Sequence, residues 1–133
     1  MISSHVIRRV ALIFLIGLLL VSPAFAGVVI SEFMASNTST LTTTNGLYED
    51  WIEIHNNSGA PVDLAGWYLT DNPSDLRKWQ FPSTAKTSPL PNNGYLIVFA
   101  DGAEDAVILG ELHASFKLSA GGEFLALVEP DGE

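Results

Sequence analysis

The most regular hydrophobic pattern in the chain lies at residues 50–56, where Asp-Trp-Ile-Glu-Ile-His-Asn alternates side-chain character with a period of two. This period is typical of a β-strand that has one face in a core and the other in water. The next segment, Asn-Ser-Gly-Ala-Pro at residues 57–61, has turn chemistry. Residues 62–70 are apolar again, so we predict that they return as a strand paired with residues 50–56, with a bulge at Gly66.

Further short strands are expected along the chain between turn signals. They are predicted at residues 27–34, 77–81, 95–100, 107–109, 112–118 and 123–128, and residues 35–46 are predicted to be an exposed loop. Residues 95–100 are apolar on both sides, which predicts the most buried strand, and residues 77–81 precede a proline, as an edge strand does. No helical periodicity occurs after residue 26. The expected fold class is therefore an all-β sandwich of the immunoglobulin-like kind.

The apolar positions of these strands define the expected core, to which Trp67 belongs. The full set is Ile30, Phe33, Trp51, Ile52, Ile54, Leu64, Trp67, Leu69, Trp79, Phe81, Leu96, Val98, Phe99, Phe116, Leu125 and Leu127.

The first 26 residues follow a different pattern. A basic segment with Arg8 and Arg9 precedes an apolar run at residues 10–21, and residues 22–26 end in the small-x-small motif that signal peptidase cleaves. We therefore predict a signal peptide over residues 1–26, cleaved after Ala26, and a secreted or cell-surface protein. The alternative is an uncleaved membrane anchor, but the apolar run is short beside the roughly 20 residues that a span requires.

Residues 27–133 are expected to form one domain. All 15 acidic residues of the chain lie in this part, against four basic ones, which leaves it a formal net charge of −11. Such a surface repels nucleic-acid phosphates, so we expect no nucleic-acid partner, and contact with a membrane only during export. The chain has no cysteine, which excludes disulfides and thiolate zinc sites and leaves the core alone to hold the domain.

Seven segments, taken together and in order, carry a family resemblance. They are residues 29–37 (VISEFMASN), 50–56 (DWIEIHN), 62–71 (VDLAGWYLTD), 78–82 (KWQFP), 94–100 (GYLIVFA), 112–119 (LHASFKLS) and 122–127 (GEFLAL). They resemble the lamin-tail domain (LTD), an immunoglobulin-like β-sandwich found in nuclear lamins and, in a bacterial version, in secreted and surface proteins.

The resemblance implies a non-catalytic module with no catalytic residues to carry over. Bacterial domains of this kind look like accessory units beside CotH-like kinase domains, extracellular nucleases and adhesive repeats. The Pro-Asp-Gly at residues 130–132 is a hairpin turn that needs a strand after it, and one residue follows. We therefore expect the last strand of the sandwich to lie beyond the chain as given, which would be the N-terminal part of a longer exported protein.

Two acidic loops are candidates for binding a divalent cation. Asp101, Glu104 and Asp105 crowd one loop, and Asp71 and Asp75 crowd the other. Calcium takes six to eight oxygen ligands, which clustered acids and loop carbonyls can supply. Neither loop has the EF-hand spacing, so solvated turns are the favoured interpretation. Calcium is kept as the one candidate cofactor, with Asp101, Glu104 and Asp105 as its candidate ligands.

No cluster in the sequence has the spacing that catalysis requires. The chain contains no His-Glu-x-x-His, no Gly-x-Ser-x-Gly and no cysteine. His55 and His113 are the only histidines after residue 26, and each stands alone. We expect His55 to be exposed or half-exposed, and Glu32 to point outward from its strand rather than act in acid–base chemistry with Glu53. No enzymatic activity is predicted for these residues.

The aromatic residues allow one further interpretation. Trp51, Trp67, Tyr68 and Trp79 could stack on a sugar if two or more lay exposed on one face. At strand spacing in a sandwich, tryptophans are core residues more often than not, so we favour the core, with Tyr68 as the exposed ring.

The function expected from the sequence is that of a non-catalytic interaction or architectural module in a larger exported protein. Its partner would be a protein or a cell-surface polymer, contacted through loops 36–49, 71–76 and 101–106. Two alternatives stay open. One is a calcium-stabilised carbohydrate-binding domain. The other is the targeting module of an extracellular kinase or nuclease whose catalytic domain lies beyond residue 133.

Overall fold

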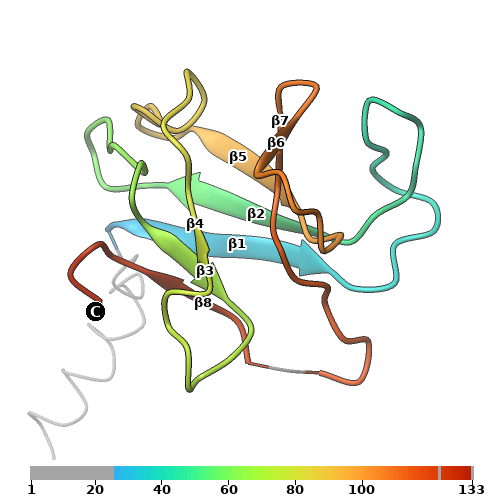
Figure 1. Ribbon diagram of the computed structural model, residues 1–133. Coiled ribbons are helices and arrows are strands. Elements are labelled where there is room, and N and C mark those ends of the chain that lie inside the picture. Colours follow the sequence, from blue (N-terminus) through green and yellow to red (C-terminus); the bar gives the residue numbers. More distant parts are fainter. Residues whose placement is uncertain (1–25, 123, 133) are drawn as a thin grey trace, which may run out of the picture.

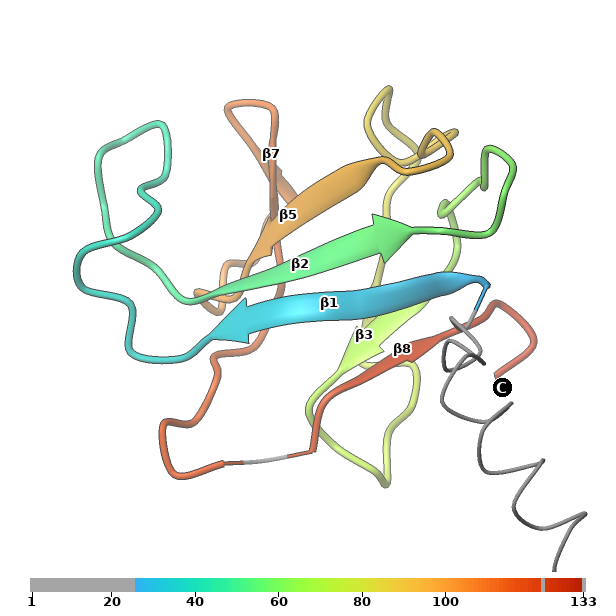
Figure 2. The same ribbon diagram turned by 180° about the vertical axis from the view of Figure 1, so that it is seen from behind.

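The strands of the molecule form two sheets that face each other (Figure 1, Figure 2). The computed structural model describes residues 26–122 and 124–132. Its strands are β1 (Val28–Met34), β2 (Trp51–Asn56), β3 (Tyr68–Thr70), β4 (Trp79–Gln80), β5 (Tyr95–Phe99), β6 (Val107–Ile108), β7 (Glu111–His113) and β8 (Ala126–Val128). Within the described part of the chain there is no helix of the length and apolarity that crossing a membrane demands.

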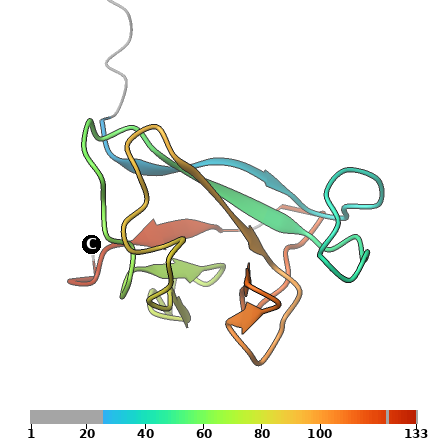
Figure 3. The ribbon, with the colours of Figure 1, turned by 90° about the horizontal axis from the view of Figure 1, so that it is seen from above.

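One sheet has five strands in the order β1-β2-β5-β7-β6, and the other has three in the order β4-β3-β8. The two layers are separated clearly when the molecule is seen from above (Figure 3). All pairings are antiparallel except that of β5 with β7, which is parallel. The expected all-β, immunoglobulin-like sandwich is confirmed, and β4 lies at the edge of its sheet as the proline after it suggested.

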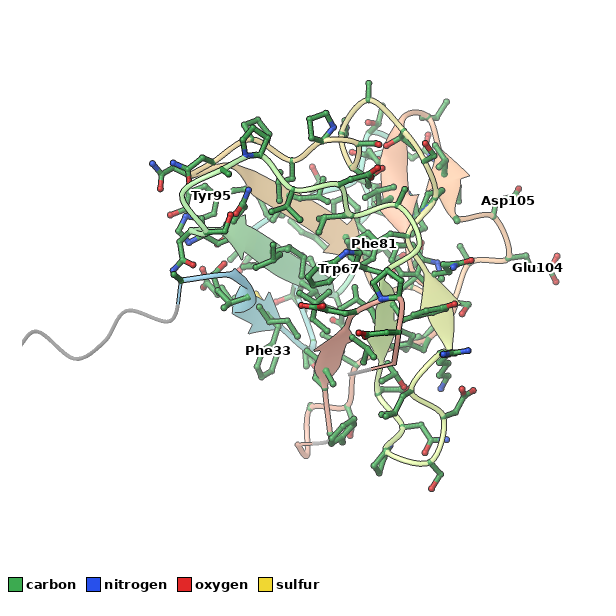
Figure 4. All side chains as sticks on the ribbon, turned by 90° about the vertical axis from the view of Figure 1, so that its left-hand side faces the viewer. Phe33, Trp67, Phe81, Tyr95, Glu104 and Asp105 are labelled. Atoms are coloured by element: carbon green, nitrogen blue, oxygen red, sulfur yellow. The ribbon has the colours of Figure 1, made fainter. Side chains whose placement is uncertain are left out.

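The core fills the space between the two sheets, where Trp67 and Phe81 lie (Figure 4). Most of the residues expected there are buried: Trp51, Ile52, Ile54, Leu64, Leu69, Trp79, Phe81, Leu96, Val98, Phe99 and Phe116. Four others are partly buried and pack against the core: Ile30, Trp67, Leu125 and Leu127. The domain thus has the apolar interior that a chain without disulfides needs.

The prediction that Phe33 belongs to the core is wrong, because its side chain is 58% exposed. Its register opposite Ile52 does aim it toward the inner face. However, β1 is an edge strand, and the strand nearest to it in the other sheet, β8, is only three residues long. Phe33 therefore projects from the open side of the sandwich (Figure 4).

The bulge of the structure lies in β1 and not at Gly66. The register of β1 shifts between Ile30 and Glu32, which leaves Ser31 as the extra residue. Both Ile30 and Phe33 therefore face inward although they are three positions apart. Glu32 is exposed, as its expected outward position requires.

Residues 62–70 do not pair with β2, so the predicted hairpin is wrong. Gly66, with a φ of 87°, lies in a tight turn in which the N–H of Trp67 donates to the C=O of Leu64 at 3.0 Å. This turn carries the chain across to the other sheet, and only Tyr68–Thr70 becomes a strand, between β4 and β8. The predicted strand over residues 62–70 is thus right only for its last three residues, and the turn at Gly66 places those in the opposite layer.

Strand β5 is central in its sheet, but the prediction that it is the most buried strand is wrong, because β2 has no exposed residue and β5 has one. Tyr95 at its start is 59% exposed, and Ile97 is half-buried. Both side chains lie on the outer face of the five-stranded sheet, because they alternate with the buried Leu96 and Val98. This outer face of β5 is open to solvent at Tyr95.

Candidate functional site

A second apolar cluster lies on the outer face of the five-stranded sheet, away from the main core. Trp51 and Phe99 are direct partners across β2 and β5, and each is only 5% exposed. They do not belong to the cluster between the sheets. The segment at residues 35–50 covers them, and the indole Nε1 of Trp51 donates to the Thr40 Oγ1 at 3.3 Å. The chain therefore fixes this segment on the sheet by a small core of its own.

Asn37 organises the covering loop from inside, since it is only 5% exposed. Its Nδ2 donates to the C=O of Leu41 at 2.6 Å and of Glu49 at 2.9 Å. Its Oδ1 accepts from the N–H of Thr40 at 3.1 Å and from the Thr40 hydroxyl at 2.8 Å. The prediction of an exposed loop at residues 35–46 is right for most positions but wrong for Asn37 and Thr43, which are buried.

A groove of about 540 Å³ lies between this loop and the segment at residues 85–91, over the outer side of β5. Its apolar lining includes Leu41, Pro89, Pro91, Tyr95, Ile97 and Phe99. The volume falls within the range of about 300–1,000 Å³ that ligand pockets in proteins occupy. Tyr95 is braced from one side, because its ring stacks on that of His55 at 4.2 Å between centroids.

The far wall of the groove is held by Asn56, which ends β2 and is fully buried. Its Nδ2 donates to the C=O of Leu90 at 3.0 Å and of Pro91 at 3.1 Å. Leu90 is further paired with Val62, with N–O distances of 2.8 and 3.0 Å. Hydrogen bonds therefore hold this wall although it carries no long strand.

The two charged side chains of the lining differ in their surroundings. Glu111, at the start of β7, accepts from the N–H of Thr44 at 2.9 and 3.1 Å and so ties the loop to the sheet. Lys86 also lines the groove and is exposed, and no ion pair to it forms among residues 26–122 and 124–132. The groove thus offers one unpaired cation in a strongly acidic domain.

The acidic loops do not contribute to this groove. Asp101 accepts from the N–H of Ala103 at 3.2 Å and lies 2.8 Å from the Nδ1 of His113, while Glu104 and Asp105 point outward (Figure 4). Asp71 is paired with Lys78 at 2.6 Å. No three acidic or histidine side chains converge anywhere in the described residues, and the calcium prediction stays untested.

The two histidines occupy separate places. His113 is 3% exposed, and its Nε2 is buried without a hydrogen-bond partner in the described chain. Its contact with Asp101 fastens the loop after β5 to β7. His55 is half-buried under Tyr95. Among the described residues, no group of three side chains able to ligate a metal includes either histidine, and Glu53 accepts a hydrogen bond from Ser31 at 2.6 Å.

The proposed sugar platform of Trp51, Trp67, Tyr68 and Trp79 does not form. Trp51 and Trp79 are both buried, Trp51 on the outer face of the five-stranded sheet and Trp79 in the core between the sheets, and Trp67 packs against that core. Tyr68, expected to be exposed, is half-buried beneath Arg77, whose guanidinium lies 5.8 Å from the ring centroid. The aromatic ring that is open to solvent beside a pocket is Tyr95 instead.

Of the three loops predicted to form a binding surface, only 36–49 contributes to the groove, through Leu41 and Thr42. Loop 71–76 projects from the three-stranded sheet, well away from the loop between β1 and β2 (Figure 1, Figure 2). The sequence interpretation missed Tyr95 and the segment at residues 85–91. Its available signal was the Pro-Leu-Pro at residues 89–91, whose prolines cannot join a ladder and so favour an exposed wall.

The comparisons with known proteins point to one family. The family model described as Lamin Tail Domain matches residues 22–133, which include every described strand. Neither the comparison with curated proteins nor the comparison with solved structures gives a match. Because the family match spans most of the chain and the fold agrees with it, this chain belongs to the lamin tail domain family.

Proposed function

We propose that this protein is an exported interaction module whose contact surface is the groove beside β5. The family is one of non-catalytic immunoglobulin-like domains, which argues against an enzyme in these residues. The observation that carries the proposal is the groove itself: an apolar depression outside the core, built by two segments that polar side chains hold in place. Concave, mostly apolar pockets of this volume with a few polar groups are where proteins commonly bind their ligands.

The export part of the proposal rests on residues 1–26, most of which lie outside the described residues. The partner is a protein or a cell-surface polymer in the extracellular space, and the module serves as an accessory unit in a larger exported protein of bacterial type. The absence of a convergent group of titratable residues in the described chain suits a module that holds a partner without transforming it.

Export is tested by expressing the full chain in a secreting host and sequencing the N-terminus of the protein in the medium or at the cell surface. The expected terminus is Gly27. A cell-retained chain that still begins at Met1 would contradict the export part.

Binding is tested with the fluorescently labelled, exported chain on intact cells and on purified cell envelopes of the source organism. Leu41→Asp places a charge in the groove and is expected to reduce binding at least tenfold. Leu47→Asp is the matched control, because Leu47 lies in the same loop, is 56% exposed and does not line the groove. Equal binding by both variants, or no binding by the unaltered chain, would refute the proposal.

A further inference from the structure

The half of β5 that borders the groove has a free backbone edge. The N–H of Ala100 donates to the C=O of Asp50 at 2.7 Å, and that of Asn56 donates to Gly94 at 3.0 Å. In an antiparallel ladder, alternate residues of a strand direct their backbone N–H and C=O groups to the same neighbour. In β5 and its flanks, the residues whose backbone groups point to β2 are Gly94, Leu96, Val98 and Ala100. Tyr95 and Ile97 therefore direct their backbone N–H and C=O groups to the opposite side.

On that opposite side, β7 covers only the end of β5. Its register places Leu112 beside Val98 and His113 beside Phe99, and the N–H of Ala114 donates to the C=O of Phe99 at 2.7 Å. The backbone N–H of Ile97 and the N–H and C=O of Tyr95 therefore have no hydrogen-bond partner among the backbone groups of residues 26–122 and 124–132. The groove runs along this uncovered stretch, since Tyr95, Leu96 and Ile97 all line it.

The segment across the groove has no free N–H at residues 89–91 with which to pair the edge. Pro89 and Pro91 have no N–H, and both backbone groups of Leu90 are committed to Val62 on the other side. The lining thus combines apolar side chains with an unpaired strand edge. Proteins that recognise peptides by strand addition use this combination, in which main-chain hydrogen bonds give affinity and pockets for alternate side chains give specificity.

We propose that the groove takes an extended peptide segment of a partner protein, which adds as a strand beside Tyr95–Ile97 in line with β7. The proposal rests on the proposed function and names the chemistry of its partner. The segment carries apolar side chains at alternate positions, which fill the space between Leu41 and Pro89. It also carries an acidic side chain at the end that meets Lys86.

The charge of the domain supports this choice of partner. Residues 27–133 carry four basic residues against 15 acidic ones, and Lys86 is the basic residue in the groove lining. Lys78 is paired with Asp71, and Arg77 lies over the Tyr68 ring. A carboxylate of a partner is therefore repelled by most of the surface and attracted at Lys86, which fixes the position of the added strand.

The test uses two capped hexapeptides of alternating valine and threonine, one beginning and one ending with aspartate, titrated into the ¹⁵N-labelled chain. The amide signals of Tyr95 and Ile97 are expected to shift. N-methylation of the valine amides or of the threonine amides gives two isomers with the same side chains. Since alternate amides of a strand point to opposite edges, one isomer should bind like the parent and the other at least tenfold more weakly.

A charge exchange tests the placement. Lys86→Glu is expected to weaken binding about fivefold, and a peptide with lysine in place of aspartate should restore it. Lys117→Glu changes the net charge equally outside the groove, and is expected to leave the preference for aspartate unchanged.

Equal effects of the two N-methylated isomers, or equal effects of Lys86→Glu and Lys117→Glu, would overturn the strand-addition proposal. Binding of the envelope glycans instead of the peptides, with loss in Leu41→Asp, would also overturn it while leaving the proposed function intact. Loss of all groove-dependent binding, to envelopes and peptides alike, would refute both.

Discussion

Asn37 is the side chain on which the geometry of one groove wall depends. It is buried, and its amide satisfies the backbone of Leu41, which lines the groove, and of Glu49 at the far end of the loop. Asn37→Ala removes these bonds and leaves two carbonyl groups without their partner. We expect a loss of about 2–3 kcal/mol in the free energy of unfolding.

Urea denaturation followed by tryptophan fluorescence measures the loss at Asn37. Asn45→Ala, in the exposed tip of the same loop, is the control and should change stability by less than about 0.5 kcal/mol. Hydrogen exchange should quicken in residues 38–49 before it does in β2. Equal stability of the two variants would show that the loop does not depend on Asn37.

Asp63 gives the other wall a pH dependence. A hydrogen bond from the Ser88 side chain, followed by one from the N–H of Ala65, lowers the pKa of the Asp63 carboxyl below its usual 3.8. The native state therefore releases this proton more readily than the unfolded state does. The stabilisation is fully present above pH 3.8 and is lost as the pH falls through the lower, native pKa.

Near neutral pH the unaltered chain is expected to melt at a higher temperature than Asp63→Asn. This difference should shrink as the pH falls below the usual pKa of a carboxyl group. Because Asp63 is at the surface, the difference should be small. Ser88→Ala removes the main cause of the shift and should reduce the same pH dependence. A difference that grows toward low pH would contradict the assignment.

At the scale of single residues, the sequence predicts burial well where alternation is regular and poorly where an edge intervenes. Ile52 and Ile54 are buried as their alternation indicates. Phe33 has the same apolar character, but it sits on an edge strand behind a bulge, and no property of residues 29–37 reveals how short the opposing β8 is. Burial there depends on distant chain, which local pattern does not contain.

Among the elements, the segment at residues 89–94 is the one that shapes the groove without being a strand. A Cβ built on Gly94 would lie 2.8 Å from the C=O oxygen of Pro91 and 3.1 Å from the Leu90 side chain. The N–H of Gly94 also donates to that same Pro91 oxygen at 2.9 Å. The turn can thus be built only with glycine at this position or by moving the wall.

We therefore expect Gly94→Ala to destabilise the domain by about 1–3 kcal/mol and to displace the wall at Pro89–Pro91. Gly27→Ala is the matched control, because a Cβ at Gly27 meets nothing within 4 Å and should leave stability nearly unchanged. Thermal melting gives the first quantity, and amide shifts of residues 85–93 give the second. An unchanged melting temperature in Gly94→Ala would mean that the turn relaxes without cost and would contradict the expectation.

Element assignment from the sequence succeeded for β2, but it made the strand at residues 62–70 too long and gave it the wrong partner. Residues 50–56 and 62–70 were both read as extended, yet only the register shows that β2 and β3 belong to different sheets. The reason is the turn at Leu64–Trp67, which redirects the chain after Val62 has bridged to Leu90. A hairpin and a crossover use the same turn residues, so composition does not separate them.

The groove could not be predicted from the sequence for a related reason. It lies between loop 36–49 and residues 85–91, which are far apart in the sequence.

For the whole molecule, the dominant long-range force is the repulsion among its acidic residues. With four basic residues against 15 acidic ones in residues 27–133, the folded state concentrates negative charge that the unfolded chain spreads out. Raising the NaCl concentration from about 20 to about 300 mM should therefore raise the melting temperature, because the Debye length falls from about 20 Å to about 6 Å and the repulsion between surface charges is screened. This screening also bears on the test of calcium.

Calcium could raise the melting temperature either by occupying the loop at Asp101, Glu104 and Asp105 or by screening the surface. The two causes separate at matched ionic strength. A bound ion adds stability that follows its concentration relative to its dissociation constant, whereas screening depends on ionic strength alone.

Glu104 and Asp105 point outward, and Asp101 is already held by His113 and Ala103, so the loop would have to rearrange to gather ligands. We expect calcium and magnesium to raise the melting temperature equally, and Glu104→Gln with Asp105→Asn to change neither response. A calcium-specific increase that disappears in this double variant would establish the site and refute the expectation.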